Sequence, residues 1–372
     1  MVKKFVYGTP FETEAVVKEI PSSEGNPDYG TFSTENGFSF TTKLADDDMV
    51  FGLGEANRGI NKRGFLYISD CADDPNHVES KTSLYAAHNF IIISGKTHVG
   101  FFFDYPGTLR FDIGYTTSDT MTVSCENADL YVYMITGDSD LDIVKQFRGI
   151  IGRSYIAPKF AFGYGQSRWG YKTEDDFRTV VKKYRENHVP LDMVYMDIDY
   201  MQDYKDFTVN EERFPDFEGF VQDMKKEKIH LVPIIDAGVK VEEGYDIYEE
   251  GCEKGYFCRR EDGSYFEATV WPGWTHFPDV LNADARKWFG DKYDVLVSKG
   301  IDAFWNDMNE PSIFYSQEGL ADFKETAKKY VEGDPEVPHY MVGGKLQALA
   351  NNHEDYNCLL YTSPSPRDGA TS

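Results

Sequence analysis

Residues 301–312 read Ile-Asp-Ala-Phe-Trp-Asn-Asp-Met-Asn-Glu-Pro-Ser, and no other stretch of the chain is as informative. Its apolar first part, 301–305, passes abruptly into acids and amides, which is typical of a buried strand that ends at a polar site. Pro311 has no N–H to donate, so it blocks further β pairing. Carboxylates at the mouth of such a strand can act on a glycosidic bond as nucleophile or acid. A polar loop that merely caps the strand is the alternative interpretation.

Strand-like and helix-like segments alternate before this stretch, from Pro158 onward. Thr173 and Asp176 form a capping box that predicts the start of a helix. Strands are expected at 160–163, 191–198, 229–235 and from 301, with further helices at 217–224 and 282–296. Three of these four strands end in aspartates, namely Asp197 with Asp199, then Asp236, then Asp307. Acids gathered at the carboxyl ends of successive parallel strands are typical of a (β/α)₈ barrel active site.

Residues 38–136 have a different rhythm of short, alternating segments separated by turns. Segments 89–93 and 99–103 flank a Ser-Gly-Lys-Thr turn and predict a hairpin, while 38–42 and 130–135 alternate. Strands at this density indicate a β-sandwich. We therefore expect an N-terminal β-sandwich domain over residues 1–150, followed over 151–358 by the N-terminal part of a (β/α)₈ TIM barrel.

Four βα units make only half a barrel and leave two open sheet edges. The last dozen residues, 361–372, are rich in Ser and Pro and have no apolar period. They look like the translated sequencing-adapter peptides at the ends of truncated gene models. The sequence therefore predicts an N-terminal fragment with a non-native or disordered tail over 359–372.

Composition limits the classes of partner. The 372 residues carry a net charge of −25, which argues against nucleic acid and anionic membrane and favours neutral substrates. Tyr, Phe and Trp make up 15% of the chain, which suits stacking against sugar rings as well as core filling.

The cysteines and the N-terminus point to a reducing, cytoplasmic location. There is no apolar signal segment and no stretch that approaches a membrane span. The five cysteines have no metal-ligand spacing, and their odd number speaks against a full disulfide framework. They are Cys71, Cys125, Cys252, Cys258 and Cys358.

Four motifs in order, spread from Phe51 to Tyr315, resemble those of glycoside hydrolase family 31, in its α-glucosidase branch. They are Phe51-Gly-Leu-Gly-Glu; Met196-Asp-Ile-Asp-Tyr-Met with Asp206-Phe-Thr and Arg213-Phe-Pro-Asp; Val270-Trp-Pro-Gly with Phe277-Pro-Asp; and Trp305-Asn-Asp-Met-Asn-Glu-Pro. One such match would be weak, but four at sensible spacing are specific. The family's sandwich-plus-barrel architecture agrees with the pattern of strands and helices.

The resemblance also implies roles for individual residues. Asp307 would be the catalytic nucleophile of a retaining reaction. Asp197 would bind hydroxyls of the terminal sugar, and Asp73 would reach the substrate from the sandwich domain. Trp271 and Trp305 would wall the first sugar pocket, and Trp169 would shape its rim. The substrate-binding residues implied in this way are Asp73, Trp169, Asp197, Ile198, Trp271, Trp305 and Met308.

Structural interpretations stand beside several of these roles. One of Asp197 and Asp199 is expected to face the pocket and the other to make a structural bond, with Asp197 favoured for the pocket. Trp271 is equally well interpreted as a core residue. The neighbouring Asp74 could take the substrate-binding role in place of Asp73. Three further aspartates are candidates for supporting groups, which would hold the hydrogen-bond donors of the site in place. They are Asp199, Asp203 and Asp236.

The acid partner of Asp307 is missing from the motifs. The family's proton donor lies on a later strand after a His-Asn motif, and His353-Glu-Asp-Tyr does not match it. The fragment is therefore predicted to be inactive alone. The intact protein is predicted to be a retaining exo-α-glucosidase acting on small neutral oligosaccharides, with no cofactor and no metal. The sequence indicates neither the preferred linkage nor the oligomeric state.

Other functions remain as alternatives. A β-glycosidase would use Glu310 of the Asn-Glu-Pro triplet as its acid, although the aspartate-rich strand ends fit that class poorly. A non-catalytic carbohydrate-binding protein and an α-xylosidase are further possibilities. A dinucleotide or phosphate enzyme is disfavoured, because Gly163-Tyr-Gly165 and Gly343-Gly-Lys345 lack the required spacing and context.

Overall fold

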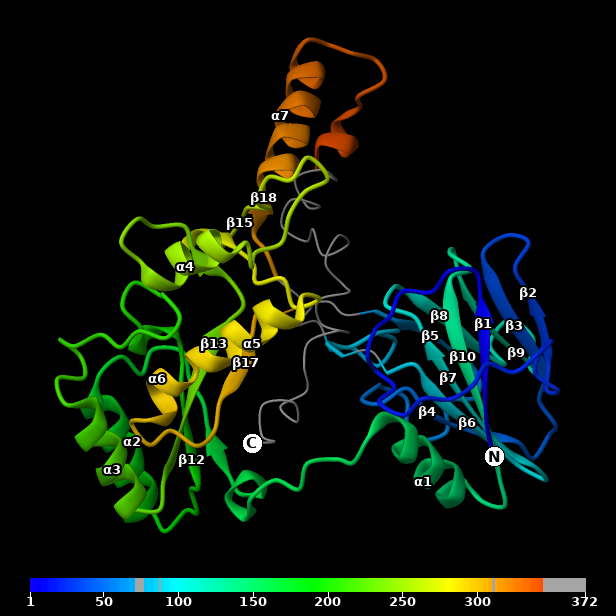
Figure 1. Cartoon of the computed structure of the whole chain (residues 1–372), viewed down its shortest axis with the longest axis horizontal. Helices are drawn as coiled ribbons and strands as arrows, with labels where there is room; N and C mark the ends of the chain where they lie inside the picture. Colours follow the sequence, from blue (N-terminus) through cyan, green and yellow to red (C-terminus); the bar gives the residue numbers. More distant parts are fainter. Residues whose placement is uncertain (71–76, 87, 310–311, 344–372) are drawn as a thin grey trace. The chain divides into compact units, whose positions relative to one another are not determined.

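The computed structural model describes residues 1–70, 77–86, 88–309 and 312–343. They divide into two compact units, and the chain passes from the first to the second between Ser154 and Tyr155 (Figure 1).

The first unit is built from two antiparallel sheets of five strands each. One sheet has the order β1 (Val2–Tyr7), β10 (Leu130–Gly137), β7 (His98–Asp104), β6 (Phe90–Ser94), β4 (Met49–Gly52). The other has the order β2 (Thr31–Ser33), β3 (Phe38–Lys43), β9 (Thr120–Cys125), β8 (Leu109–Ile113), β5 (Phe65–Ser69).

Phenylalanine rings from both sheets form the core of this unit. Phe40 of β3 and Phe101 of β7 are fully buried, with ring centroids 4.7 Å apart. The predicted hairpin is confirmed, because β6 and β7 pair antiparallel from Ser94–His98 onward. The first unit is therefore the predicted β-sandwich.

Both faces of strand β10 are covered. Leu130 and Val132 lie in the sandwich core, whereas Tyr133 and Ile135 pack with Ile143 of helix α1 (Asp140–Ile151). The helix runs beside the sheet (Figure 1) and supplies the second apolar layer.

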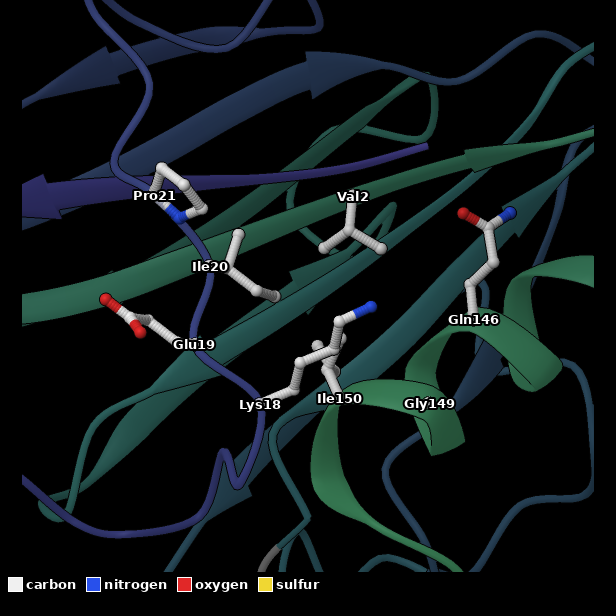
Figure 2. Close-up of a pocket in the computed structure, with 8 residues that line it drawn as sticks. All are labelled: Val2, Lys18, Glu19, Ile20, Pro21, Gln146, Gly149 and Ile150. Carbon is white, nitrogen blue, oxygen red and sulfur yellow. The ribbon is translucent and has the colours of Figure 1, made fainter.

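A shallow cavity of about 420 Å³ lies between α1 and the N-terminal segment. Figure 2 shows Val2, Ile20 and Ile150 at its centre, with Lys18 and Glu19 beside them. Its apolar lining, without an aromatic ring, does not resemble a sugar-binding surface.

The second unit contains a parallel sheet with helices on one face. The strand order is β11 (Gly165–Gln166), β12 (Met193–Met196), β13 (His230–Asp236), β17 (Trp305–Asp307), and all neighbours are parallel. The helices of this unit are α2 (Glu174–Glu186), α3 (Phe217–Lys226), α4 (Asp246–Lys254), α5 (Ala283–Lys292), α6 (Asp294–Val297) and α7 (Gln317–Val331).

Side chains on α2, α3, α5 and α6 form one apolar cluster with β12 and β13. A smaller antiparallel sheet arises from the excursion after β13. Its order is β14 (Val239–Lys240), β16 (Gly273–His276), β15 (Ala268–Val270), β18 (Tyr315–Ser316). Four parallel strands with covering helices are part of a (β/α)₈ barrel, as predicted.

The first predicted barrel strand, 160–163, is wrong. Lys159–Phe162 form a 3₁₀ turn that begins after Pro158, and the Gly163 N–H donates to the Phe160 carbonyl at 2.9 Å. Phe160 stacks on His230 with ring centroids 3.6 Å apart. Strand β11 starts at Gly165, where pairing with β12 begins.

Two other boundaries also differ from the prediction. The helix expected over 282–296 is divided at Tyr293 into α5 and α6. The fourth strand begins at Trp305 rather than at Ile301. Among the described residues, no helix is long and apolar enough to cross a membrane.

The predicted capping box at the start of α2 is confirmed, since Thr173 Oγ1 accepts the Asp176 N–H and Asp176 accepts the Thr173 N–H. Thr173→Ala should therefore lower the free energy of unfolding by about 1 kcal/mol. Urea denaturation of the full-length protein measures this loss. Thr173→Ser keeps the hydroxyl and should restore most of it, so equal losses in both variants would contradict the capping role.

Candidate active site

One face of the parallel sheet carries several of the candidate residues. Register pairs Tyr195 with Val232, Trp305 with Ile234, and Asp307 with Asp236. Paired and alternate residues of parallel strands share a face. Tyr195, Trp305, Asp236 and Asp307 therefore share one face. The Tyr195 and Trp305 rings meet edge-to-face across the intervening strand, with centroids 6.0 Å apart.

The opposite face belongs to the helices. Asn306 points there, and its Oδ1 accepts a hydrogen bond from the Tyr293 hydroxyl at 2.6 Å. This bond joins the helix layer to the residue that precedes Asp307, so it fixes which side of β17 Asp307 occupies.

Strand β17 stops directly after Asp307. Met308 has a φ of +57°, in the left-handed region that side chains other than glycine rarely adopt. Its side chain is 8% exposed. Such a conformation costs on the order of 1–3 kcal/mol and persists only where the surroundings impose it. The turn holds Asp307 at the carboxyl end of the strand.

Asp197 follows β12 with an extended backbone, so it keeps the side of the sheet that Tyr195 occupies. Its carboxylate accepts the Ile198 N–H at 2.8 Å and caps the 3₁₀ turn Ile198–Tyr200. Burial raises the pKa of Asp197 above its ordinary value; the Asp199 charge adds to this rise, and the Ile198 N–H opposes it.

The same turn separates Asp197 from its neighbours. Asp199 is 1% exposed and pairs with Arg213 at 3.4 Å and Lys172 at 3.8 Å. It therefore makes a structural ion pair, as expected for the partner of Asp197. Ile198 is 2% exposed and packs in the apolar cluster of the helices, so its side chain presents almost no surface to a ligand.

A second buried acid, Asp206, lies against the end of β13 and was not among the predicted site residues. Asp206 and Asp236 are each 1% exposed, and Asp206 Oδ1 accepts the Asp236 N–H at 2.9 Å. Burial, with a further contribution from the charge of Asp236, raises the pKa of Asp206 well above its usual range.

Three exposed aromatic rings gather in this unit. The rings of Trp169 and Trp271 lie 6.2 Å apart, and Phe314 meets Trp271 edge-to-face at 5.1 Å. Their exposures are 62%, 44% and 38%. Trp271 is therefore not a core residue, and Phe314 is an aromatic neighbour that the sequence did not single out.

Two predicted residues, Asp73 of the sandwich domain and Glu310 of the alternative mechanism, lie outside the described residues. Among the residues that are described, no group of three or more His, Cys, Asp or Glu side chains is arranged to hold a metal ion.

A β-sandwich followed by βα units with acids at the strand ends is the architecture of a class of barrel enzymes that bind substrates at that edge. Residues 154–359 match the glycosyl hydrolases family 31 TIM-barrel domain, and residues 11–112 match the glycosyl hydrolase 31 N-terminal galactose mutarotase-like domain. The chain belongs to glycoside hydrolase family 31.

Several relatives are α-glucosidases by name. Alpha-glucosidase 2 of Bacillus thermoamyloliquefaciens is 37% identical over 277 residues, which cover 73% of this chain and 35% of that protein. The alpha-glucosidase of Saccharolobus solfataricus is 28% identical over 318 residues, covering 84% and 46%.

Two solved structures are similar in fold. A family 31 dextranase of Flavobacterium johnsoniae complexed with isomaltotriose has a TM-score of 0.71 at 22% identity, covering 89% of this chain and 38% of that one. A glucosidase II alpha subunit has a TM-score of 0.65 at 26% identity, covering 74% and 33%. The chain spans less than half of the length of each of these four proteins.

Proposed function

We propose that this chain is part of a retaining exo-α-glucosidase, which removes terminal α-linked glucose from the non-reducing ends of neutral oligosaccharides. The main support for this proposal is the register of β17 in a chain that belongs to family 31. This register aligns Asp307 with Asp236 on the face of the sheet that also bears Tyr195 and Trp305. A carboxylate beside apolar ring surfaces suits attack on a sugar carbon.

In this mechanism Asp307 attacks the anomeric carbon while an acid protonates the departing glycosidic oxygen. The covalent glycosyl-enzyme is then hydrolysed by a water molecule that gives its proton to the same group, now acting as base, with net retention. Asp197 binds hydroxyls of the terminal glucose through its carboxylate oxygens. Trp305 forms an apolar wall of the pocket, and Met308 lies beside the nucleophile.

The acid itself is not among the motifs of this chain. A retaining pair needs two carboxyl groups about 5–5.5 Å apart, and the four described parallel strands form only part of a barrel. We infer that further strands of a longer protein supply the acid and that this segment alone does not turn over substrate.

The aromatic cluster of Trp169, Trp271 and Phe314 is proposed to hold sugar rings by stacking. Trp271→Ala should raise KM for oligosaccharides about tenfold, because one aromatic contact contributes on the order of 1 kcal/mol. Steady-state kinetics with oligosaccharides of increasing length measure this. Trp271→Phe keeps a ring and should retain most of the affinity; an unchanged KM in Trp271→Ala would contradict a binding role.

Activity of the full-length protein on paired α- and β-glucosides tests the function. We expect hydrolysis of the α-anomer only, with glucose as the first product. Exclusive action on the β-anomer would favour the alternative with Glu310 as acid. Oligosaccharide binding without hydrolysis would favour a non-catalytic protein. A cytoplasmic location is also proposed, and it is supported by Cys125 and Cys252, which form no disulfide.

A further inference from the structure

A buried carboxyl group lies against the strand next to that of the candidate nucleophile. Asp206 is 1% exposed. Its Oδ1 accepts the Asp236 N–H at 2.9 Å, and its buried Oδ2 has no hydrogen-bond partner among the described residues. Asp236 in turn pairs in register with Asp307. One backbone hydrogen bond therefore joins Asp206 to the strand end beside Asp307.

The loop that carries Asp206 is firmly held. Asp203, Tyr204 and Phe207 all have φ values in the left-handed region, at +53°, +59° and +60°. The Asp206 carbonyl accepts the Tyr245 hydroxyl at 2.8 Å, and the Phe207 ring packs on Tyr293 at 5.3 Å. Three residues in an unfavourable conformation within one loop indicate that packing imposes the position of Asp206.

Among the residues that the structure describes, the titratable groups around Asp206 supply no positive charge. They are Asp236 of β13, Tyr200 of the 3₁₀ turn, Tyr245 before α4 and Tyr293 between α5 and α6. Burial is the main cause that raises the pKa of each tyrosine, so all three are neutral. The neighbouring Lys205 is paired with Glu242 at 2.6 Å. An ionised Asp206 would be buried beside Asp236, with one backbone N–H as its only hydrogen-bond donor among the described residues.

We propose that the buried side chain of Asp206 carries a proton, and that neutral Asp206 is a positioning residue for the strand ends beside Asp307. The proton removes one negative charge from the neighbourhood of Asp307. A negative charge there would disfavour the ionised form of Asp307, which the nucleophile needs. This inference rests on the proposed role of Asp307.

The pH dependence of stability follows from the raised pKa of Asp206. A carboxyl whose pKa is higher in the folded than in the unfolded state binds its proton more tightly when folded. Its contribution to stability is therefore greatest below the unfolded value of about 4, and it is lost as pH rises from there towards the folded value. An amide at this position would not show that loss.

The test compares Asp206→Asn with Asp206→Ala in the full-length protein. An asparagine reproduces a protonated carboxyl, with an oxygen to accept and an N–H to donate, whereas alanine leaves the Asp236 N–H without its acceptor. We expect kcat/KM of Asp206→Asn to stay within about threefold of wild type and that of Asp206→Ala to fall about tenfold or more. Equal losses in both variants would overturn the proposal, because Asp206 would then act as an anion.

Thermal unfolding between about pH 4 and 8 gives a second readout that does not depend on activity. The Tm of Asp206→Asn minus that of wild type should increase with pH. Asp203→Asn, in the exposed part of the same loop, is the matched control, and its Tm difference should stay level. A level or falling difference for Asp206→Asn would refute the proposal, even if Asp206→Ala fails to fold. If the wild-type protein lacks α-glucosidase activity, the proposed function fails, while the Tm series still decides where the proton resides.

Discussion

Asp307→Asn in the full-length protein is expected to lower kcat on α-glucosides by about 10⁴-fold, because an amide cannot form the glycosyl ester. Binding should be retained, since the amide has nearly the same shape and Trp305 still walls the pocket. Steady-state kinetics give the loss in kcat, and calorimetric titration with an oligosaccharide gives the binding.

Asp302→Asn is the matched control for this variant. Asp302 lies five positions earlier in the chain, near the start of the parallel strands, where it pairs with His230 at 3.0 Å and with Lys225 at 3.3 Å. This change should affect stability and leave kcat nearly unaltered. Near-normal activity of Asp307→Asn, or equal losses in the two variants, would rule out Asp307 as nucleophile.

Asp197→Ala is expected to lower kcat/KM by about 10²-fold or more. Two hydrogen bonds from sugar hydroxyls to a partly buried carboxylate contribute on the order of 3 kcal/mol. Truncation also frees the Ile198 N–H that Asp197 now caps.

A set of monodeoxy glucosides separates binding from structural damage. If Asp197 contacts a given hydroxyl, wild type should lose activity on the glucoside that lacks it, and Asp197→Ala should show a much smaller further loss. A loss in Asp197→Ala that is the same for every substrate would indicate a general structural defect.

Local signals in the sequence explain what it predicted correctly. The capping box at Thr173 and the hairpin of β6 and β7 depend on residues close together in the chain. The aspartates at the strand ends stand out because an apolar run changes abruptly to acids. The positions of Asp236 and Asp307 at strand ends were therefore predictable from this pattern. Because their two strands are parallel, the two residues pair in register.

Features imposed by tertiary packing were missed. Asp206 lies in a polar loop without periodicity, and its burial results from packing against β13. The pairing of Trp169 with Trp271 and Phe314 joins three distant segments. Likewise, α1 buries the second face of β10, and nothing within 130–135 indicates that cover.

Covalent labelling would identify the nucleophile. The full-length protein would be incubated with a fluorinated α-glucosyl fluoride, which forms a slowly hydrolysed glycosyl-enzyme with a retaining enzyme. Peptide mass spectrometry would then locate the attached sugar. We expect one labelled peptide with the sugar on Asp307, and no label in Asp307→Asn. A label on another carboxylate such as Glu310, or none while the enzyme still hydrolyses α-glucosides, would contradict this assignment.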